Sequence, residues 1–163
     1  MLRLFYRVYR IFLYFVRPLT LGVRVILLRD STVLLVRQTY MDGWFLPGGG
    51  MKKNETFEQA ARREACEEVG AQIKRLALVG VYSNFAEWKS DHNIVFVSRQ
   101  FTLSGQHDHE IAEVRFFPLD ALPADLWPGH RRRLEEFRRL LKRAGRAKET
   151  AFDSGAISRF GEW

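Results

Sequence analysis

Hydrophobic residues along the chain fall into five runs that have the composition of β-strands. Each run is rich in β-branched, aliphatic or aromatic residues and is bounded by turn-forming or charged residues, as strands commonly are. The expected strands are residues 21–28, 32–37, 72–82, 93–102 and 114–118. Because only Arg29, Asp30 and Ser31 separate the first two runs, we expect these two strands to form a hairpin.

A different spacing lies between the second and third runs, where an apolar residue recurs at every fourth position and predicts a short helix. The residues of this apolar stripe are Phe57, Ala61, Ala65 and Val69. Thr56 followed by Gln59 forms a capping box, which satisfies N–H groups at the start of a helix. Gly70 can take the left-handed conformation that ends one. The pattern therefore predicts a helix over residues 57–69.

Two further helices are expected, one near each end of the chain. Residues 130–144 place several apolar side chains on one helical face. Residues 1–17 are mostly apolar, with arginines at positions 3, 7, 10 and 17 that follow a helical spacing. This segment is too short and too often interrupted by arginine to span a bilayer, and it lacks the cleavage site of a signal peptide. It either packs against the domain or a sister subunit, or lies as a basic aromatic helix at a membrane surface.

Strands interrupted by helices predict an α/β fold in which helices cover the faces of a mixed sheet. With 163 residues, 47% of them hydrophobic, the chain has the size and composition of one folded domain. We expect an amphipathic helix at residues 1–17, the folded domain at residues 18–148 and a C-terminal tail at residues 149–163. The tail is either mobile or folds over the functional site.

The formal net charge of +7 is concentrated at the two flanks of the chain. Residues 130–148 contain nine Lys and Arg against Glu135 and Glu136. An excess of positive charge attracts polyanions or membranes and says little about the fold. The basic flanks are therefore candidates for contact with RNA or with a membrane surface. The single cysteine, Cys66, cannot form an internal disulfide, which fits a protein of the reducing cytoplasm.

Three glutamates of the predicted central helix, Glu64, Glu67 and Glu68, point to chemistry. Residues three and four positions apart are neighbours on a helix, so Glu64 faces both of the others, and each like-charge pair costs a few tenths of a kcal/mol. A hard divalent cation such as Mg²⁺ would offset this repulsion, because it takes oxygen ligands from carboxylates, waters and substrate phosphates. The alternative is a solvated helix face on which the glutamates pair with Arg62 and Arg63.

The same region resembles the signature of the Nudix hydrolases. In that signature a glycine is followed after five residues by a glutamate, and after seven more by an Arg-Glu pair that leads into two adjacent glutamates and a glycine. The matching residues are Gly49, Glu55, Arg63, Glu64, Ala65, Glu67, Glu68, Gly70 and Ala71. Ala65 and Ala71 stand where the family more often has Leu, Ile or Val, which we interpret as variation in packing. The resemblance implies an α/β/α sandwich around a mixed β-sheet.

The resemblance also implies a function, namely the metal-dependent hydrolysis of a nucleoside diphosphate that is linked to another group. Glu64 and Glu68 would be the principal ligands of Mg²⁺ or Mn²⁺, and Glu67 would hold a second ion or a metal-bound water. Arg63 would orient a carboxylate, and Glu55 would anchor the preceding loop to the helix. These roles are carried over from similar residues of the family.

The general base lies outside the signature in several members of the family. We favour Glu110, which lies in a polar loop before the last expected strand, and Glu113 is the second choice. The alternative for Glu110 is an exposed loop charge without a catalytic role.

Glycines and aromatic residues are the candidates for contact with the substrate. Consecutive glycines allow the backbone to approach a ligand or the helix closely, and aromatic side chains in a polar stretch can stack on a base. The candidates are Gly48, Gly49, Gly50, Phe85 and Trp88. Trp44 is more simply a core residue. The substrate would be a small nucleotide, such as ADP-ribose or a nucleoside triphosphate.

Two other functions are compatible with the sequence. The basic helix over residues 130–146 could recruit RNA, so that the enzyme removes a 5′ pyrophosphate or a cap, although this helix is more simply packed on the sheet. A sensor could keep the fold and bind a nucleotide without turnover, but the complete set of Arg63 and the three glutamates argues against it. A homodimer is also compatible with the sequence.

Overall fold

A computed structural model of the protein describes residues 19–84, 90–105 and 108–153, with side chains as far as residue 143. The helix expected at residues 1–17 and residues 154–163 of the expected tail lie outside this part of the chain. Among the described residues, no helix has the length and hydrophobicity needed to cross a membrane.

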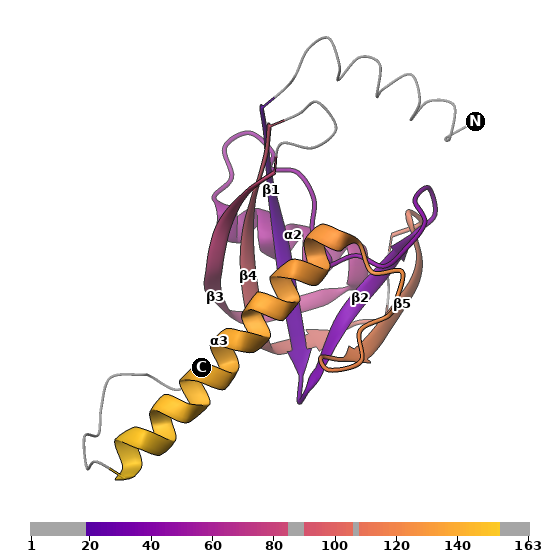
Figure 1. Ribbon diagram of the computed structural model, residues 1–163. Helices are drawn as coiled ribbons and strands as arrows, with labels where there is room; N and C mark the ends of the chain where they lie inside the picture. The colour runs from indigo at the N-terminus through magenta and orange to yellow at the C-terminus, as the bar shows by residue number, and fades with distance from the viewer. Residues whose placement is uncertain (1–18, 85–89, 106–107, 154–163) are drawn as a thin grey trace.

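The five expected strands are confirmed, and they form one mixed sheet (Figure 1). The order across the sheet is β3-β4-β1-β2-β5, with β1 and β4 parallel and the other neighbours antiparallel. The strands are β1 (Leu19–Arg29), β2 (Thr32–Gln38), β3 (Ala71–Asn84), β4 (Ser90–Leu103) and β5 (Ile111–Pro118). Each strand extends beyond the run that predicted it, because backbone pairing continues past the last apolar residue.

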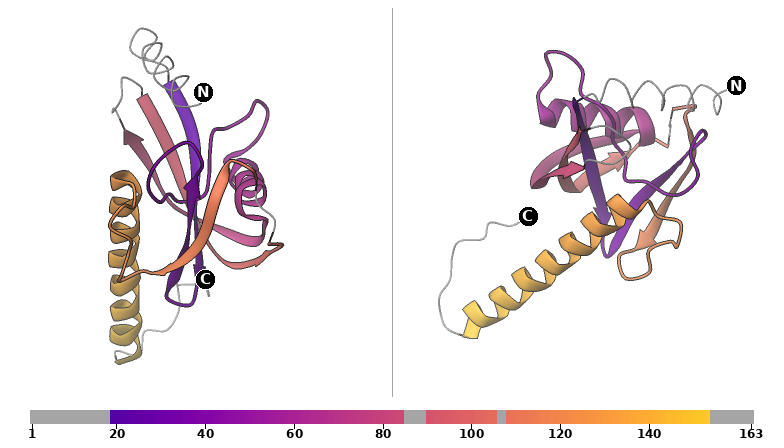
Figure 2. Two further views of the ribbon diagram at one scale, coloured as in Figure 1. Left: turned by 90° about the vertical axis from the view of Figure 1, so that its right-hand side faces the viewer. Right: turned by 45° about the horizontal axis from the view of Figure 1, so that its top comes forward.

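Within the described residues, two helices cover the sheet, one on each side (Figure 2). Helix α2 (Phe57–Val69) has the predicted bounds, and helix α3 (Pro128–Asp153) begins two residues earlier and ends nine residues later than expected. The α/β/α sandwich is thus confirmed. The end of α3 also lies five residues beyond the domain boundary that the sequence places at residue 148.

Strands β1 and β2 separate soon after their hairpin (Figure 1). They pair at Leu28 with Val33 and at Arg29 with Thr32. The segment of residues 44–51 follows the diverging strands and bonds to both of them: Val25 N–H donates to Pro47 O at 2.9 Å, and Val36 N–H donates to Phe45 O at 2.9 Å. The loop therefore satisfies backbone groups that the separated strands would otherwise leave unpaired.

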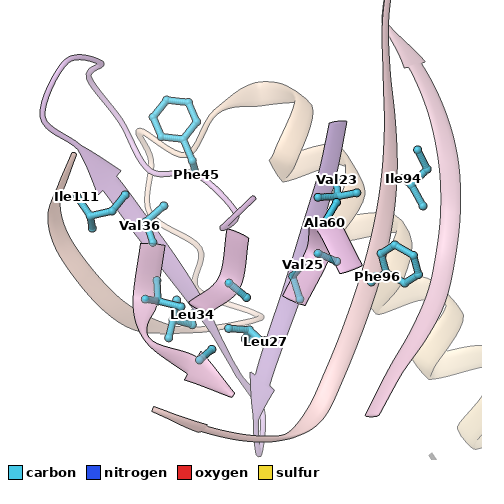
Figure 3. Packing of buried hydrophobic residues seen from close by; sticks show 14 residues of the cluster. Val23, Val25, Leu27, Leu34, Val36, Phe45, Ala60, Ile94, Phe96 and Ile111 are labelled. Carbon is cyan, nitrogen blue, oxygen red and sulfur yellow. The ribbon is translucent and has the colours of Figure 1, made fainter. Parts of the chain in front are cut away.

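The core has two layers because alternate residues of a strand point to opposite faces of the sheet. Val23, Val25 and Leu27 of β1 pack toward α2, in the cluster shown in Figure 3. Ile26 and Leu28 belong to the second cluster, which includes Leu134 and Phe137 of α3. Strands β1 and β2 contribute residues to both layers, so they help to place α2 and α3 relative to each other.

The small residues of α2 allow the helix to lie close to the sheet. Ala60, Ala61 and Ala65 are fully buried, and Val69 is buried at the end of the helix. Phe57 differs from the expectation, because it is 42% exposed and the buried stripe begins at Ala60. The first turn of α2 therefore contributes little to the core, and its stability depends on the helix cap.

Candidate active site

Helix α2 begins and ends at the residues that the sequence predicts. The Thr56 hydroxyl accepts a hydrogen bond from Gln59 N–H, and the Gln59 side chain accepts one from Thr56 N–H. At the other end, Gly70 has φ 63° and its N–H donates to carbonyls of the last turn. Because both ends are fixed, the positions of the glutamates along the helix are fixed as well.

Arg63 connects the helix with the loop before it. Its guanidinium forms a bidentate contact with Glu55, at 3.0 Å from Nε and 2.7 Å from Nη2. Its Nη1 donates to Glu64 Oε1 at 2.6 Å and to Glu67 Oε2 at 3.0 Å, and its Nη2 donates to Gly50 O at 3.0 Å. These bonds place Arg63 at the centre of the signature residues, where it holds two of the three glutamates and the end of the glycine turn.

The predicted anchoring role of Glu55 has a clear geometric basis. Besides the contact with Arg63, the carboxylate accepts a hydrogen bond from Lys52 N–H. The Arg63 hydrogen bonds and the Lys52 N–H lower the pKa of Glu55 to about 2, so the carboxylate stays ionised. The hydrogen bonds to Glu55 also raise the pKa of Arg63. Glu55 thus ties the loop to the helix by charge-assisted bonds.

Glu64 and Glu68 both reach the glycine turn. Glu68 Oε2 accepts a hydrogen bond from Gly48 N–H at 2.7 Å. A Cβ atom added to Gly49 would lie 2.6 Å from Glu64 Oε2, so this carboxylate fills the space that a side chain would take. The glycine run predicted a close approach of the backbone. At Gly48 and Gly49 the groups that the backbone approaches are carboxylates of α2. Gly50 contributes through its carbonyl, and its Cβ position is open.

The environment of Glu68 differs from that of the other glutamates. Desolvation raises the pKa of its carboxyl to about 7, while the Gly48 N–H and the positive charge of Arg24 act in the opposite direction. Glu64 raises the same pKa further through like-charge repulsion. Glu67, in contrast, has a side chain that is 46% exposed. The two carboxylates at the turn therefore lie in a partly desolvated place where a cation would stabilise both.

The donor set fits a hard divalent cation. Glu64 and Glu68 meet consecutive residues of one turn, and Glu67 lies beside Glu64 on the shared guanidinium of Arg63. In the described part of the chain no three Asp, Glu, His or Cys side chains are already gathered as a metal site. Arg63 bonds to Glu64 and Glu67, whereas Glu68 turns to the Gly48 N–H. A bound cation would therefore compete with Arg63 for the carboxylates of Glu64 and Glu67.

Three polar residues near the glutamates were not singled out from the sequence. Arg24 of β1 donates to Gly48 O, and its buried Nε has no hydrogen-bond partner among the described residues. Gln38 donates a side-chain hydrogen bond to Glu68. The half-buried Tyr40 has a raised pKa, through desolvation and then through the charges of Glu110 and Glu68. The sequence did contain one indication that Arg24 has a special role, because it is the only charged residue in the apolar run 21–28.

The loop that carries Glu110 lies at the C-terminal end of α2. Asp108 N–H donates to Glu67 O at 3.1 Å, and Thr39 N–H donates to Glu110 O at 2.9 Å. The charges of Glu110 and Glu68 both raise the pKa of Tyr40, so the three side chains lie in one region. Glu113 instead bonds to Arg115 on β5. The catalytic role of Glu110 stays a prediction, and the structure offers it a better position than it offers Glu113.

The aromatic candidates have different outcomes. Phe85 and Trp88 lie outside the described residues. Trp44 is buried and packs edge-on against Phe117, as a core residue does.

The loop of residues 44–51 is also held from the α3 side. His130 Nδ1 accepts a hydrogen bond from Leu46 N–H at 2.9 Å, and the Trp127 ring stacks on Phe45 at 5.6 Å. Burial lowers the pKa of His130 well below its usual value, and the charges of Arg24 and Arg133 lower it further. His130 is therefore neutral and can act as an acceptor. The glycine turn follows directly on this supported segment.

Comparison with known proteins gives a consistent result. The family model of the NUDIX domain matches residues 18–137. A Bacillus subtilis (strain 168) protein with the provisional name 8-oxo-dGTP diphosphatase is 29% identical over 140 residues, which are 85% of this chain and 91% of that protein. An RNA pyrophosphohydrolase of Xylella fastidiosa (strain M12) is 33% identical over 82 residues, which are 50% of this chain and 43% of that protein.

A similar fold occurs among solved structures. The crystal structure of a MutT NUDIX hydrolase from Burkholderia pseudomallei superimposes with a TM-score of 0.65 at 27% identity. The superposition covers 72% of this chain and 96% of the other.

Proposed function

Since this chain belongs to the NUDIX domain family and is a hydrolase of the Nudix type, we propose that it cleaves a phosphoanhydride bond in a nucleoside diphosphate linked to another group. The observation that carries this proposal is the convergence of Glu64 and Glu68 on the glycine turn. A turn that presents backbone groups beside two carboxylates can hold both a cation and the phosphates that the cation binds.

Glu64 and Glu68 would hold Mg²⁺ or Mn²⁺, with Glu67 as a further ligand. When bound, such an ion screens the negative charge of the phosphates and lowers the pKa of water. Arg63 would keep the carboxylates in position through its bonds to Glu55 and the turn. Glu110 would accept a proton from the attacking water.

A small nucleotide is the substrate that we favour, because the Bacillus subtilis relative, which matches 85% of this chain, is named for a nucleoside triphosphate. Removal of a 5′ pyrophosphate from RNA is the second candidate, and it is supported by the name of the Xylella relative. Both substrates offer the same phosphoanhydride chemistry to the glutamates.

The homodimer, the cytoplasmic location and a membrane contact through residues 1–17 stay predictions.

The proposal is tested by incubating the full chain with ADP-ribose, nucleoside triphosphates that include 8-oxo-dGTP, and 5′-triphosphorylated RNA, each with Mg²⁺ or Mn²⁺. We expect wild-type turnover of one substrate class and a loss of roughly a hundredfold or more in Glu68→Gln, because a metal ligand is removed. Glu58→Gln is the matched control, since Glu58 is an exposed glutamate of the same helix outside the signature. Metal-dependent nucleotide binding without any turnover would favour the sensor instead.

A further inference from the structure

A second candidate site lies on the other helix. Between α3 and the segment of residues 119–122 that follows β5, the structure contains a cavity of about 290 Å³. Helix α3 lies on the opposite side of the sheet from α2 (Figure 2), so this cavity is separate from the glutamates of the signature. We call it the α3 groove, and its polar lining consists of Asp120, Arg131, Glu135, Arg138, Arg139 and Lys142.

Two arginines of the α3 groove are held in place by backbone carbonyls. Arg138 Nη1 donates to Leu119 O at 3.2 Å, and Arg131 Nη2 donates to Pro123 O at 2.5 Å. A guanidinium has five N–H donors, so each anchored arginine keeps donors for a ligand. Because the side chains are already fixed, less conformational entropy is lost when an anion binds. Arg139 and Lys142 are exposed and add two further cations at the same cavity.

The lining residues follow the axis of the helix. Arg131, Glu135, Arg138 and Lys142 are spaced four, three and four residues apart, so they share one face of α3. From Arg131 to Lys142 this face extends over about 16 Å of helix. A single phosphate cannot reach cations spread over that distance, whereas an extended polyanion can.

The two carboxylates indicate what else the ligand carries. Asp120 and Glu135 would repel a ligand made of phosphate alone, but they can accept hydrogen bonds from hydroxyl groups or amines. RNA offers a 2′-hydroxyl beside every phosphate. We propose that the α3 groove binds the sugar-phosphate backbone of single-stranded RNA. A lipid surface fits less well, because it is flat and the cations line a hollow.

This inference does not depend on the proposed hydrolase activity, because it uses neither the metal nor the glutamates of α2. The test measures fluorescence anisotropy of labelled single-stranded RNA of about 12 nucleotides, within the range of single-strand site sizes. The RNA has a 5′-hydroxyl end, and EDTA is present throughout, so that the catalytic site has no triphosphate and no metal. Failure of this experiment is thus distinguishable from failure of the turnover assay.

The decisive comparison is between two charge-reversed double variants. Arg139→Glu with Lys142→Glu removes two cations of the groove, and Arg132→Glu with Arg143→Glu changes the net charge equally on exposed residues of α3 that do not line it. We expect affinity to fall about tenfold or more in the groove variant and by about twofold or less in the control. The wild type should show a log-log salt slope of about −3, since four cations neutralise phosphates on a single strand.

Three outcomes would overturn the inference. The first is no binding by the wild type at about 50 mM salt, where phosphate contacts are strong. The second is an equal loss in both variants, which would mean attraction by net charge without a site. The third is binding to phosphatidylserine vesicles that depends on the groove while RNA binding does not. Equal affinity for a DNA strand of the same sequence would contradict the role given to Asp120 and Glu135.

Discussion

At the scale of single residues, three adjacent glycines have three different tasks. A Cβ atom on Gly48 would lie 2.2 Å from Val23 O, and the residue has φ 135°, so both the backbone and its angle require glycine. A Cβ atom on Gly49 would meet the movable carboxylate of Glu64. At Gly50 nothing lies within 4 Å of the added atom. In this turn Gly48 is thus required by the fold, Gly49 makes room for a carboxylate of the candidate site, and Gly50 has space for a side chain.

We expect alanine at these positions to separate stability from activity. Gly48→Ala should lower the free energy of unfolding by about 1–3 kcal/mol, because of backbone strain. Gly49→Ala should keep most of the stability but lower kcat/KM roughly tenfold to a hundredfold, because it displaces Glu64, which we propose as a metal ligand. Gly50→Ala is the matched control and should change the free energy of unfolding by less than about 0.5 kcal/mol.

Urea unfolding and turnover of the substrate found above measure the two effects. If Gly49→Ala lost stability and kept its kcat/KM, the contact between this turn and Glu64 would have no part in the chemistry.

At the scale of elements, α2 is a helix whose first turn is poorly buried. The buried stripe begins at Ala60, while Phe57 and Glu58 are exposed. The capping box at Thr56 and Gln59 therefore takes the role that packing has elsewhere in the helix. The cap also fixes the residue at which the helix starts. It therefore fixes the position of each glutamate along the helix axis relative to the glycine turn.

Removal of the cap gives a prediction for this element. Thr56→Ala should lower the free energy of unfolding by about 1 kcal/mol, because the Gln59 N–H loses its acceptor. Thr56→Ser keeps a hydroxyl at the same position and should retain most of the stability. Chemical denaturation of the three proteins checks this, and equal losses in both variants would mean that the hydroxyl is not what caps the helix.

At the scale of the whole molecule, one loop joins both helical layers. Residues 44–51 bond to β1 and β2, and they contact the carboxylates of α2 through the glycines. On the other side they are held by His130 of α3 and by Trp127, which comes directly before this helix. The acceptor at Leu46 N–H is an imidazole that is neutral because it is buried and faces Arg24 and Arg133. Protonation of His130 would remove this acceptor and add a third positive charge.

The stability of the molecule should therefore depend on pH through His130. Its pKa is lower in the folded protein than in the unfolded chain, where it is about 6.5. The unfolded state thus takes up the proton first. The contribution of His130 to the free energy of unfolding is complete above about pH 6.5. Below this pH it falls by up to about 1.4 kcal/mol per pH unit.

The comparison with His130→Asn isolates this residue from the other titrating groups. Asparagine can still accept from Leu46 N–H but does not titrate, so the variant should be less stable at neutral pH and lack this part of the pH dependence. The difference in unfolding free energy between the two proteins should shrink between about pH 7 and pH 5. A constant difference over this range would show that His130 does not titrate on unfolding.

Much of the fold follows from local patterns in the sequence. Helix α2 has its predicted bounds because Thr56, Gln59 and Gly70 act on groups only a few residues away. The signature places Arg63 beside Glu67 for the same reason, since residues four positions apart are neighbours on a helix. The strands were found from their apolar runs, but their ends were not, because pairing with a neighbouring strand continues beyond the apolar residues.

The tertiary structure decided what depends on residues distant in the sequence. Arg24 bonds to the glycine turn, and Gln38 bonds to Glu68, only because β1 and β2 separate and the turn lies between them. The α3 groove likewise exists only because the segment after β5 returns to the face of α3. The sequence by itself determined the helix and the positions of its carboxylates, since these interactions are local. Strand order and loop placement determined which other side chains meet them, because these contacts form only when the sheet is assembled.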